Sequence, residues 1–180
     1  MLAAVAGVAA AAGFVAHRYG AAPGEVLRRL GAPGPANPRA REVTLYFADP
    51  RWTRLVPESR RISPGADAVD AIRALVGALI DGPAGEAAPV LPRGAELVGA
   101  YLGPEGLAVV DFAPEIASYD PGGASGEILT VFAVVHTLAE NVPEVERVQW
   151  LVGGQVRETL WGHVKISEPL GPDPQWTAAR

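Results

Sequence analysis

Two apolar runs on either side of Gly103-Pro104-Glu105-Gly106 constrain the fold more than any other feature of the sequence. The runs are AELVGAYL and LAVVDFAPEI, and the four residues between them begin and end with turn-forming glycine. This pattern predicts an antiparallel β-hairpin, because such short connections suit strands that reverse direction. The hairpin then needs other elements of the chain to cover one of its faces.

A helix is predicted on each side of this hairpin. In residues 63–83, apolar residues recur at helical spacing, Ser63 or Asp67 can cap the start, and Gly82-Pro83 ends the helix. The second helix has Ser125 as its expected N-cap and Glu127 in its first turn, where the helix dipole favours an acid. A helical wheel centres its apolar arc on four residues: Ile128, Phe132, Val135 and Ala139.

Strands are predicted at three further places. Residues 42–49 alternate apolar and polar side chains, residues 53–62 are extended but interrupted by Pro57, and residues 146–154 contain a last alternating run. The core order is therefore α-β-β-α-β, preceded by one or two strands. We predict an α+β fold in which a single sheet carries both helices on one face and is more open on the other.

The N-terminal residues divide the chain. Residues 1–16 contain no charge and no proline, so they are interpreted as a membrane anchor or an export signal, cleaved or uncleaved. Residues 17–42 are a Pro/Gly-rich linker, residues 43–170 the folded domain, and residues 171–180 a disordered tail. The folded domain is expected outside the cytoplasm, tethered to the membrane, or secreted if the signal is cleaved. The arginines that follow the apolar run favour the opposite orientation.

Composition excludes several functions. The net charge is −5 with a pI near 5.2, and no basic cluster is interleaved with aromatic residues, so we predict no nucleic-acid partner. The absence of cysteine excludes disulfides, thiolate nucleophiles and Cys-ligated zinc. No glycine-rich phosphate loop and no G-x-S-x-G nucleophile motif is present; the glycines around Ser125 precede a helix as a cap.

His136 and Glu140 are the first candidates for chemistry, because their spacing places two metal-ligating groups on one helical face. With His163 they could serve a metal-assisted cell-wall hydrolase. The helical wheel, however, puts His136 at the edge of the apolar arc and Glu140 on the solvent side with Thr137 and Ala133. A His-Glu pair in such a place is commonly a weak surface contact. We therefore assign no catalytic, cofactor-binding or metal-binding residue and expect no cofactor.

Asp111 and two tryptophans leave alternatives open. Asp111 ends a hairpin strand, where an acid could line a cleft, but the proline-containing turn after it favours a structural role. Trp150 and Trp161 lie near the last predicted strand, and either belongs to the core or to a binding surface.

The order of the motifs resembles the GerMN domain, the sporulation and spore germination module. The resemblance covers about residues 43–170 and rests on VTLYFAD, LVPESRRI, LVGALIDGP, the hairpin, ILTVFAVVHTLAENVPEVERVQWLVGGQ and WGHVKISEPL. It implies an extracytoplasmic α/β domain, related in shape to ring-building motifs, that acts by protein contacts rather than catalysis. Gly162-His163 matches the family as a structural turn, whereas the position of His136 is not catalytic in it. Family members are often lipoproteins, and without cysteine this chain would be attached through residues 1–16.

Three functions are consistent with these residues and with the resemblance. The first is a non-catalytic, extracytoplasmic interaction module of the cell envelope, linked to sporulation or germination complexes, with an envelope or membrane protein as partner. The alternatives are the hydrolase that uses His136, Glu140 and His163, and a small-ligand sensor domain. The hydrolase requires the two histidines to converge, because bonds of about 2 Å cannot join a metal to side chains more than roughly 10 Å apart.

Overall fold

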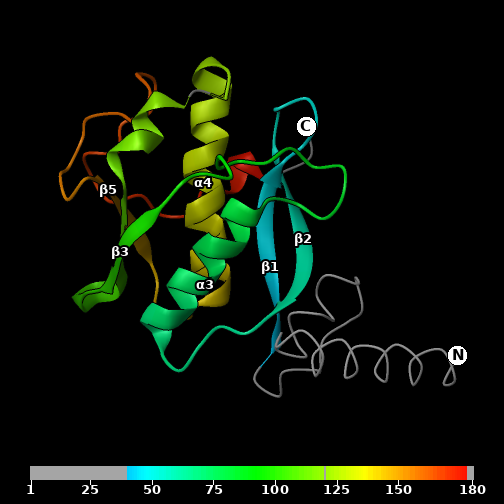
Figure 1. Cartoon of the computed structure of the whole chain (residues 1–180), viewed down its shortest axis with the longest axis vertical. Helices are drawn as coiled ribbons and strands as arrows, with labels where there is room; N and C mark the ends of the chain where they lie inside the picture. Colours follow the sequence, from blue (N-terminus) through cyan, green and yellow to red (C-terminus); the bar gives the residue numbers. More distant parts are fainter. Residues whose placement is uncertain (1–39, 120, 178–180) are drawn as a thin grey trace, which may run out of the picture. The chain divides into compact units, whose positions relative to one another are not determined.

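Two helices lie between two β-sheets in the structure, a computed structural model that describes residues 40–119 and 121–177 (Figure 1). The element order agrees with the predicted α-β-β-α-β core preceded by two strands, and the α+β class is confirmed. The strands and helices are β1 (Arg41–Ala48), β2 (Leu55–Ile62), α3 (Ala68–Asp81), β3 (Leu97–Leu102), β4 (Leu107–Phe112), α4 (Gly123–Asn141) and β5 (Arg147–Val152).

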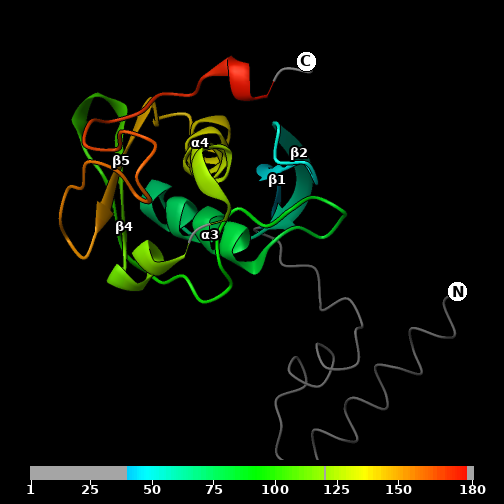
Figure 2. The same cartoon turned by 90° about the horizontal axis from the view of Figure 1, so that it is seen from above.

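The expectation of a single sheet holds only for the core strands. β3 and β4 form the predicted antiparallel hairpin, β5 joins β4 in parallel, and β1 pairs with β2 in a separate two-stranded sheet. Figure 2 shows α3 and α4 between these two sheets. Alternating side chains indicate that a strand has one buried face, but they do not indicate which side of a helix that face covers.

The helix α4 is buried on more sides than the helical wheel predicted. Ala133 and Thr137, expected near solvent, are fully buried, whereas Ile128 and Phe132, at the centre of the expected apolar arc, are only partly buried. The reason is that α4 contacts β1 on one side and β5 on another. A helix enclosed by two sheets has no single apolar stripe, so a helical wheel does not predict which of its residues are buried.

The helix starts agree with the sequence in one case and differ in the other. Asp67 caps α3 as predicted, with its carboxylate accepting a hydrogen bond from the Asp70 N–H at 2.8 Å. The helix α4 begins at Gly123 with Gly122 as N-cap, so Ser125 lies inside the first turn and does not cap it.

The segment after β5 covers that strand's edge. Leu170 and Val148 exchange two backbone hydrogen bonds of 2.8 and 2.9 Å, and the Gln149 side chain donates to the Ile166 carbonyl. Residues 171–177 are not the disordered tail that was predicted. They contain a 3-10 turn, η3 (Pro174–Trp176). The ring centroid of Trp176 lies 5.7 Å from that of Phe132 on α4.

The predicted membrane segment and nearly all of the linker fall outside the described residues. The strand β1 already begins at Arg41, inside the range predicted as linker. Within residues 40–119 and 121–177, neither helix combines the length and apolar character needed to cross a bilayer.

Candidate interaction surface

The two histidines of the hydrolase alternative are held at different places on α4. His136 Nε2 lies 3.0 Å from the Asp173 carbonyl, while His163 Nδ1 lies 3.0 Å from Glu127. Glu127 and His136 are nine residues apart in the helix, which is about 13 Å along its axis. The structure therefore does not assemble His136, Glu140 and His163, and no group of three or more metal-ligating side chains forms among the described residues.

His136 is buried rather than lying at a wet edge. Its side chain packs beside Tyr46, with ring centroids 5.4 Å apart, and only 8% of the residue is exposed. Burial lowers the pKa of the imidazole, which outweighs the opposing effect of the Asp173 carbonyl and of nearby acids. A neutral imidazole either donates from a protonated Nε2 to that carbonyl or accepts the Asp173 N–H, 3.3 Å away, at an unprotonated Nε2. In both tautomers His136 fastens the C-terminal segment to α4.

Glu127 is the buried acid that sequence reasoning misplaced. It was expected in the first turn of the helix, but α4 begins at Gly123, so Glu127 lies beyond that turn. Its carboxylate is buried and accepts the backbone N–H groups of Leu160, Trp161 and His163 at 2.7 to 2.9 Å. Burial alone would raise the pKa of Glu127, but these N–H groups hold it below its usual range. The signal in the sequence was an acid next to the apolar run ILTVFAVV, since a carboxylate in such a place needs partners.

Asp111 and the two tryptophans have structural roles. Asp111 accepts the Gly154 N–H at 2.9 Å, so it holds the turn after β5 and not the proline-containing turn that follows it in the sequence. Trp150 is fully buried and stacks on Phe112, and half-buried Trp161 donates from Nε1 to the Ile116 carbonyl at 3.0 Å.

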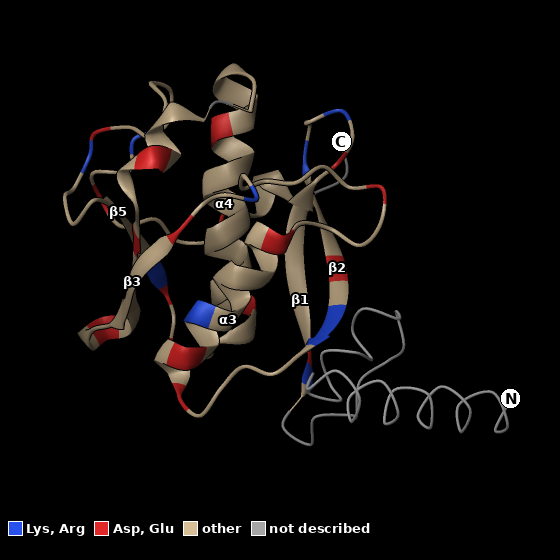
Figure 3. Ribbon diagram, viewed as in Figure 1, with Lys and Arg blue, Asp and Glu red and all other residues tan. Residues whose placement is uncertain are grey.

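The edge of β3 is the open edge of the three-stranded sheet. The strand pairs with β4 on one side, and no other described strand pairs with its far side. A bulge between Leu97 and Gly99 leaves Val98 48% exposed, and Tyr101 is 61% exposed. The sequence of β3, LVGAYL, contains neither charge nor proline, the devices that commonly protect an edge strand from pairing. Figure 3 shows that acidic and basic residues are spread over helices, strands and loops of the domain.

Tyr101 is placed by the glycine beside it. A Cβ atom at Gly99 would lie 3.0 Å from Cε2 of Tyr101 and 3.3 Å from Cβ of Asp111. The Tyr101 ring therefore lies over Gly99, on the face of the sheet opposite the buried residues Ala100 and Val110. The backbone at Gly99 thus fixes the position of the exposed Tyr101 ring.

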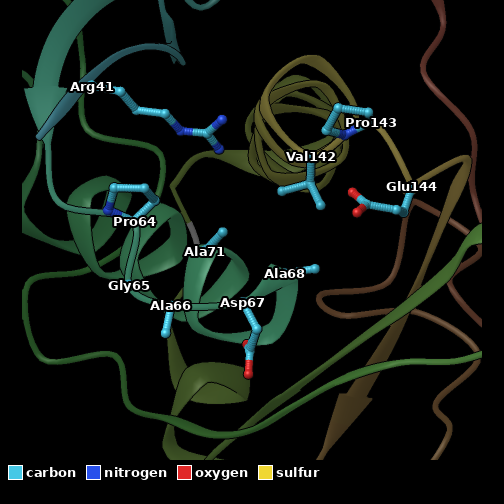
Figure 4. Close-up of a pocket in the computed structure, with 10 residues that line it drawn as sticks. All are labelled: Arg41, Pro64, Gly65, Ala66, Asp67, Ala68, Ala71, Val142, Pro143 and Glu144. Carbon is cyan, nitrogen blue, oxygen red and sulfur yellow. The ribbon is translucent and has the colours of Figure 1, made fainter. Parts of the chain in front are cut away.

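A second feature is a pocket of about 360 Å³ between the start of α3 and the end of α4 (Figure 4). Arg41 and Glu144 point into it from opposite sides, and Arg41 also donates to the Asn141 carbonyl at 2.9 Å. Asp67 belongs to the lining but caps α3. The lining residues include no histidine, serine or threonine, so the pocket holds no side-chain hydroxyl nucleophile beside an imidazole base.

These observations define a small α+β domain with an exposed apolar strand edge and no assembled catalytic set among the described residues. The chain belongs to the Germane family, described as sporulation and spore germination, whose model matches residues 44–158. The GerMN resemblance is confirmed by this match.

Three solved structures share the fold. The tandem GerMN domains of the sporulation protein GerM from Bacillus subtilis are 22% identical, with a TM-score of 0.63 over 82% of this chain and 51% of that one. The first GerMN domain of the same protein is 22% identical, with a TM-score of 0.59 over 73% of this chain and 97% of that one. A candidate lipoprotein from Clostridium perfringens is 23% identical, with a TM-score of 0.53 over 73% of this chain and 87% of that one. A comparison with curated proteins gives no significant match.

Proposed function

We propose that this protein is a non-catalytic interaction module of the cell envelope, which docks onto a partner protein through the edge of β3. The observation that carries the proposal is the contrast between the two edges of one sheet. The edge of β5 is closed by Leu170, whereas the edge of β3 exposes Val98 and Tyr101 without a charge or a proline. An unprotected apolar edge is a surface on which a partner strand can pair.

Location in the envelope is the second part of the proposal. The family is described as sporulation and spore germination, and one structural neighbour is a candidate lipoprotein. Because this sequence contains no cysteine to acylate, we propose that apolar residues 1–16 tether it, with the folded domain outside the cytoplasm. Reporter fusions at the C-terminus test this orientation, and an active cytoplasmic reporter would contradict it.

Photo-crosslinking in whole cells tests the docking surface. Tyr101→p-benzoylphenylalanine places the photoreactive group on the β3 edge. Arg61→p-benzoylphenylalanine is the matched control, because Arg61 is also exposed on a strand but belongs to the other sheet. Ultraviolet light should give one discrete adduct from position 101 and none from position 61. The same adducts at both positions, or none at position 101, would refute docking at this edge.

A substitution at the bulge separates docking from folding. Val98→Lys puts a positive charge on the open edge, where it opposes strand addition but stays in water. The crosslink from position 101 should fall at least tenfold, while the urea midpoint of the protein stays unchanged. An unchanged crosslink would show that the partner does not use the strand edge.

A further inference from the structure

Two of the four tryptophans in the chain, Trp52 and Trp176, meet at a pocket of about 280 Å³. It lies between the turn that joins β1 to β2, the first turns of α4, and η3 near the C-terminus. The other lining residues are Thr53, Ser125, Ile128 and Leu129. None of the six side chains is charged. The volume is near the lower limit for small-molecule sites, which suits one ring rather than a long ligand.

Trp52 is held in a backbone conformation that a bulky residue rarely adopts. Its φ angle is +54°, in the left-handed region where glycine or asparagine is the usual choice. Asp49 enforces this conformation. The Asp49 carbonyl accepts the Trp52 N–H at 2.9 Å, and its carboxylate accepts the N–H groups of Thr53 and Arg54 at 2.6 and 3.0 Å. An indole kept at a strained turn position, where glycine would fit without strain, points to a use for the ring.

Trp176 reaches the pocket because its segment is fastened at two points. The His136 imidazole bonds the Asp173 carbonyl at 3.0 Å, and the Trp176 ring packs 5.7 Å from Phe132. Asp173 in turn caps the 3-10 turn by accepting the Gln175 N–H at 3.0 Å. Both indoles are therefore held by contacts outside the pocket, so the pocket is formed before a ligand enters.

The lining combines aromatic side chains with neutral hydroxyl groups. The Thr53 hydroxyl donates to the Asp49 carboxylate at 3.0 Å, so its lone pairs stay available to accept from a ligand, and Ser125 adds a second hydroxyl. Aromatic faces carry partial negative charge and attract weakly positive C–H groups. A sugar ring offers such C–H groups on its face and hydroxyls on its rim.

We propose that this pocket binds a single ring of a neutral saccharide, stacked against Trp52 and hydrogen-bonded at its rim by Thr53. A charged ligand would find no counter-charge among the lining residues, and a purely apolar ligand would make no hydrogen bond with the acceptor lone pairs of the two hydroxyls. An extended proline-rich peptide also stacks on aromatic residues, but it needs a groove longer than this pocket. The proposal is independent of the β3 edge, which belongs to the other sheet.

Indole N–H signals in two-dimensional ¹H–¹⁵N spectra test the proposal with the full chain in a detergent that has no sugar headgroup. The probes are the N-acetylglucosamine disaccharide, maltose, a decaproline peptide and benzene. At least one of the two sugars should shift the signals of Trp52 and Trp176 and saturate with a Kd of about 1 mM or tighter. Trp150 and Trp161 are internal controls and should not move. No saturable shift with either sugar, or shifts with decaproline or benzene alone, would overturn the proposal.

Variants at the strained position separate binding from folding. Trp52→Gly removes the indole at a position that glycine adopts without strain, so the protein should fold and bind the sugar at least tenfold more weakly. Trp52→Phe keeps an aromatic face and should retain most of the affinity. Trp161→Phe, at a half-buried tryptophan outside the pocket, should leave it unchanged. Full affinity in Trp52→Gly, or a loss in Trp161→Phe alone, would refute the assigned site.

Discussion

Asn141, in the last turn of α4, hydrogen-bonds both backbone groups of Thr44 in β1. Its Oδ1 accepts the Thr44 N–H at 2.9 Å, and its Nδ2 donates to the Thr44 carbonyl at 2.7 Å. One turn earlier, the Thr137 hydroxyl accepts the Tyr46 N–H at 3.0 Å. Side chains of α4 thus replace a neighbouring strand along the free edge of β1, which removes an edge that other chains could pair with.

Replacing Asn141 should destabilise the domain because two backbone groups of β1 lose their partner together. We expect Asn141→Ala to lower the free energy of unfolding by about 2 kcal/mol. Glu140→Ala, at the exposed neighbouring position, is the control and should change it by less than about 0.5 kcal/mol. Urea denaturation measures both, and equal effects of the two variants would refute the role of Asn141.

Glu127→Gln should weaken the attachment of residues 160–163 to α4. A neutral amide accepts fewer and weaker hydrogen bonds than the carboxylate, so we expect a loss of about 3 kcal/mol in unfolding free energy at pH 7. The pKa of Glu127 is lowered in the folded protein, so its contribution is complete above the ordinary value of about 4.3. It is lost as the pH falls through the lowered pKa. The difference between the proteins should therefore shrink in acid, and a constant difference would contradict this assignment.

His136 should make stability depend on pH. Burial lowers its pKa below the ordinary value of about 6.5, so the unfolded chain takes up the proton first as the pH falls. The contribution of the neutral imidazole is therefore complete above about pH 6.5 and is lost as the pH falls through the lowered pKa. In His136→Phe, which keeps an aromatic ring beside Tyr46, this dependence should disappear. Urea unfolding of both proteins between about pH 7.5 and 5 measures it, and parallel curves would contradict the prediction.

Two glycines should respond to alanine in opposite ways. A Cβ at Gly77, inside α3, meets no atom within 4 Å, so Gly77→Ala should add about 0.5 to 1 kcal/mol of stability. At Gly106, with φ of +67°, a Cβ would lie 2.8 Å from the Glu144 carbonyl oxygen. Gly106→Ala should cost about 2 kcal/mol or more, since it combines strain with a clash against backbone. Melting temperatures that move in the same direction would refute this distinction.

The elements that the sequence predicted well are those whose signal is local. The turn at Gly103–Gly106 and the stop at Gly82 depend on neighbouring residues alone, and the structure has both. The sheet to which each strand belongs depends on contacts with distant residues, so it could not be predicted from local sequence. Residues 42–49 form a strand as expected, but the helix α4 separates it from the core sheet because Thr137 and Asn141 bind its edge.

The candidate site was predictable only in part. The open edge follows from the hairpin, yet the exposure of Val98 depends on a bulge that alternation does not reveal. His136 and Thr137 were interpreted as partly or fully exposed because a polar residue on an amphipathic helix usually faces water. In this helix they face backbone groups of other segments, which a single sequence does not identify.

Because α4 lies between the two sheets, we expect both sheets to unfold together in one cooperative step. Leu45 and Phe47 of β1 and Val148 and Trp150 of β5 belong to the same buried cluster as this helix, so neither sheet has a core of its own. Opening one sheet would expose α4 and leave the other without support. The backbone amides of α4 should therefore exchange with deuterium only when the whole domain unfolds, whereas those of the β3 edge should exchange through local opening.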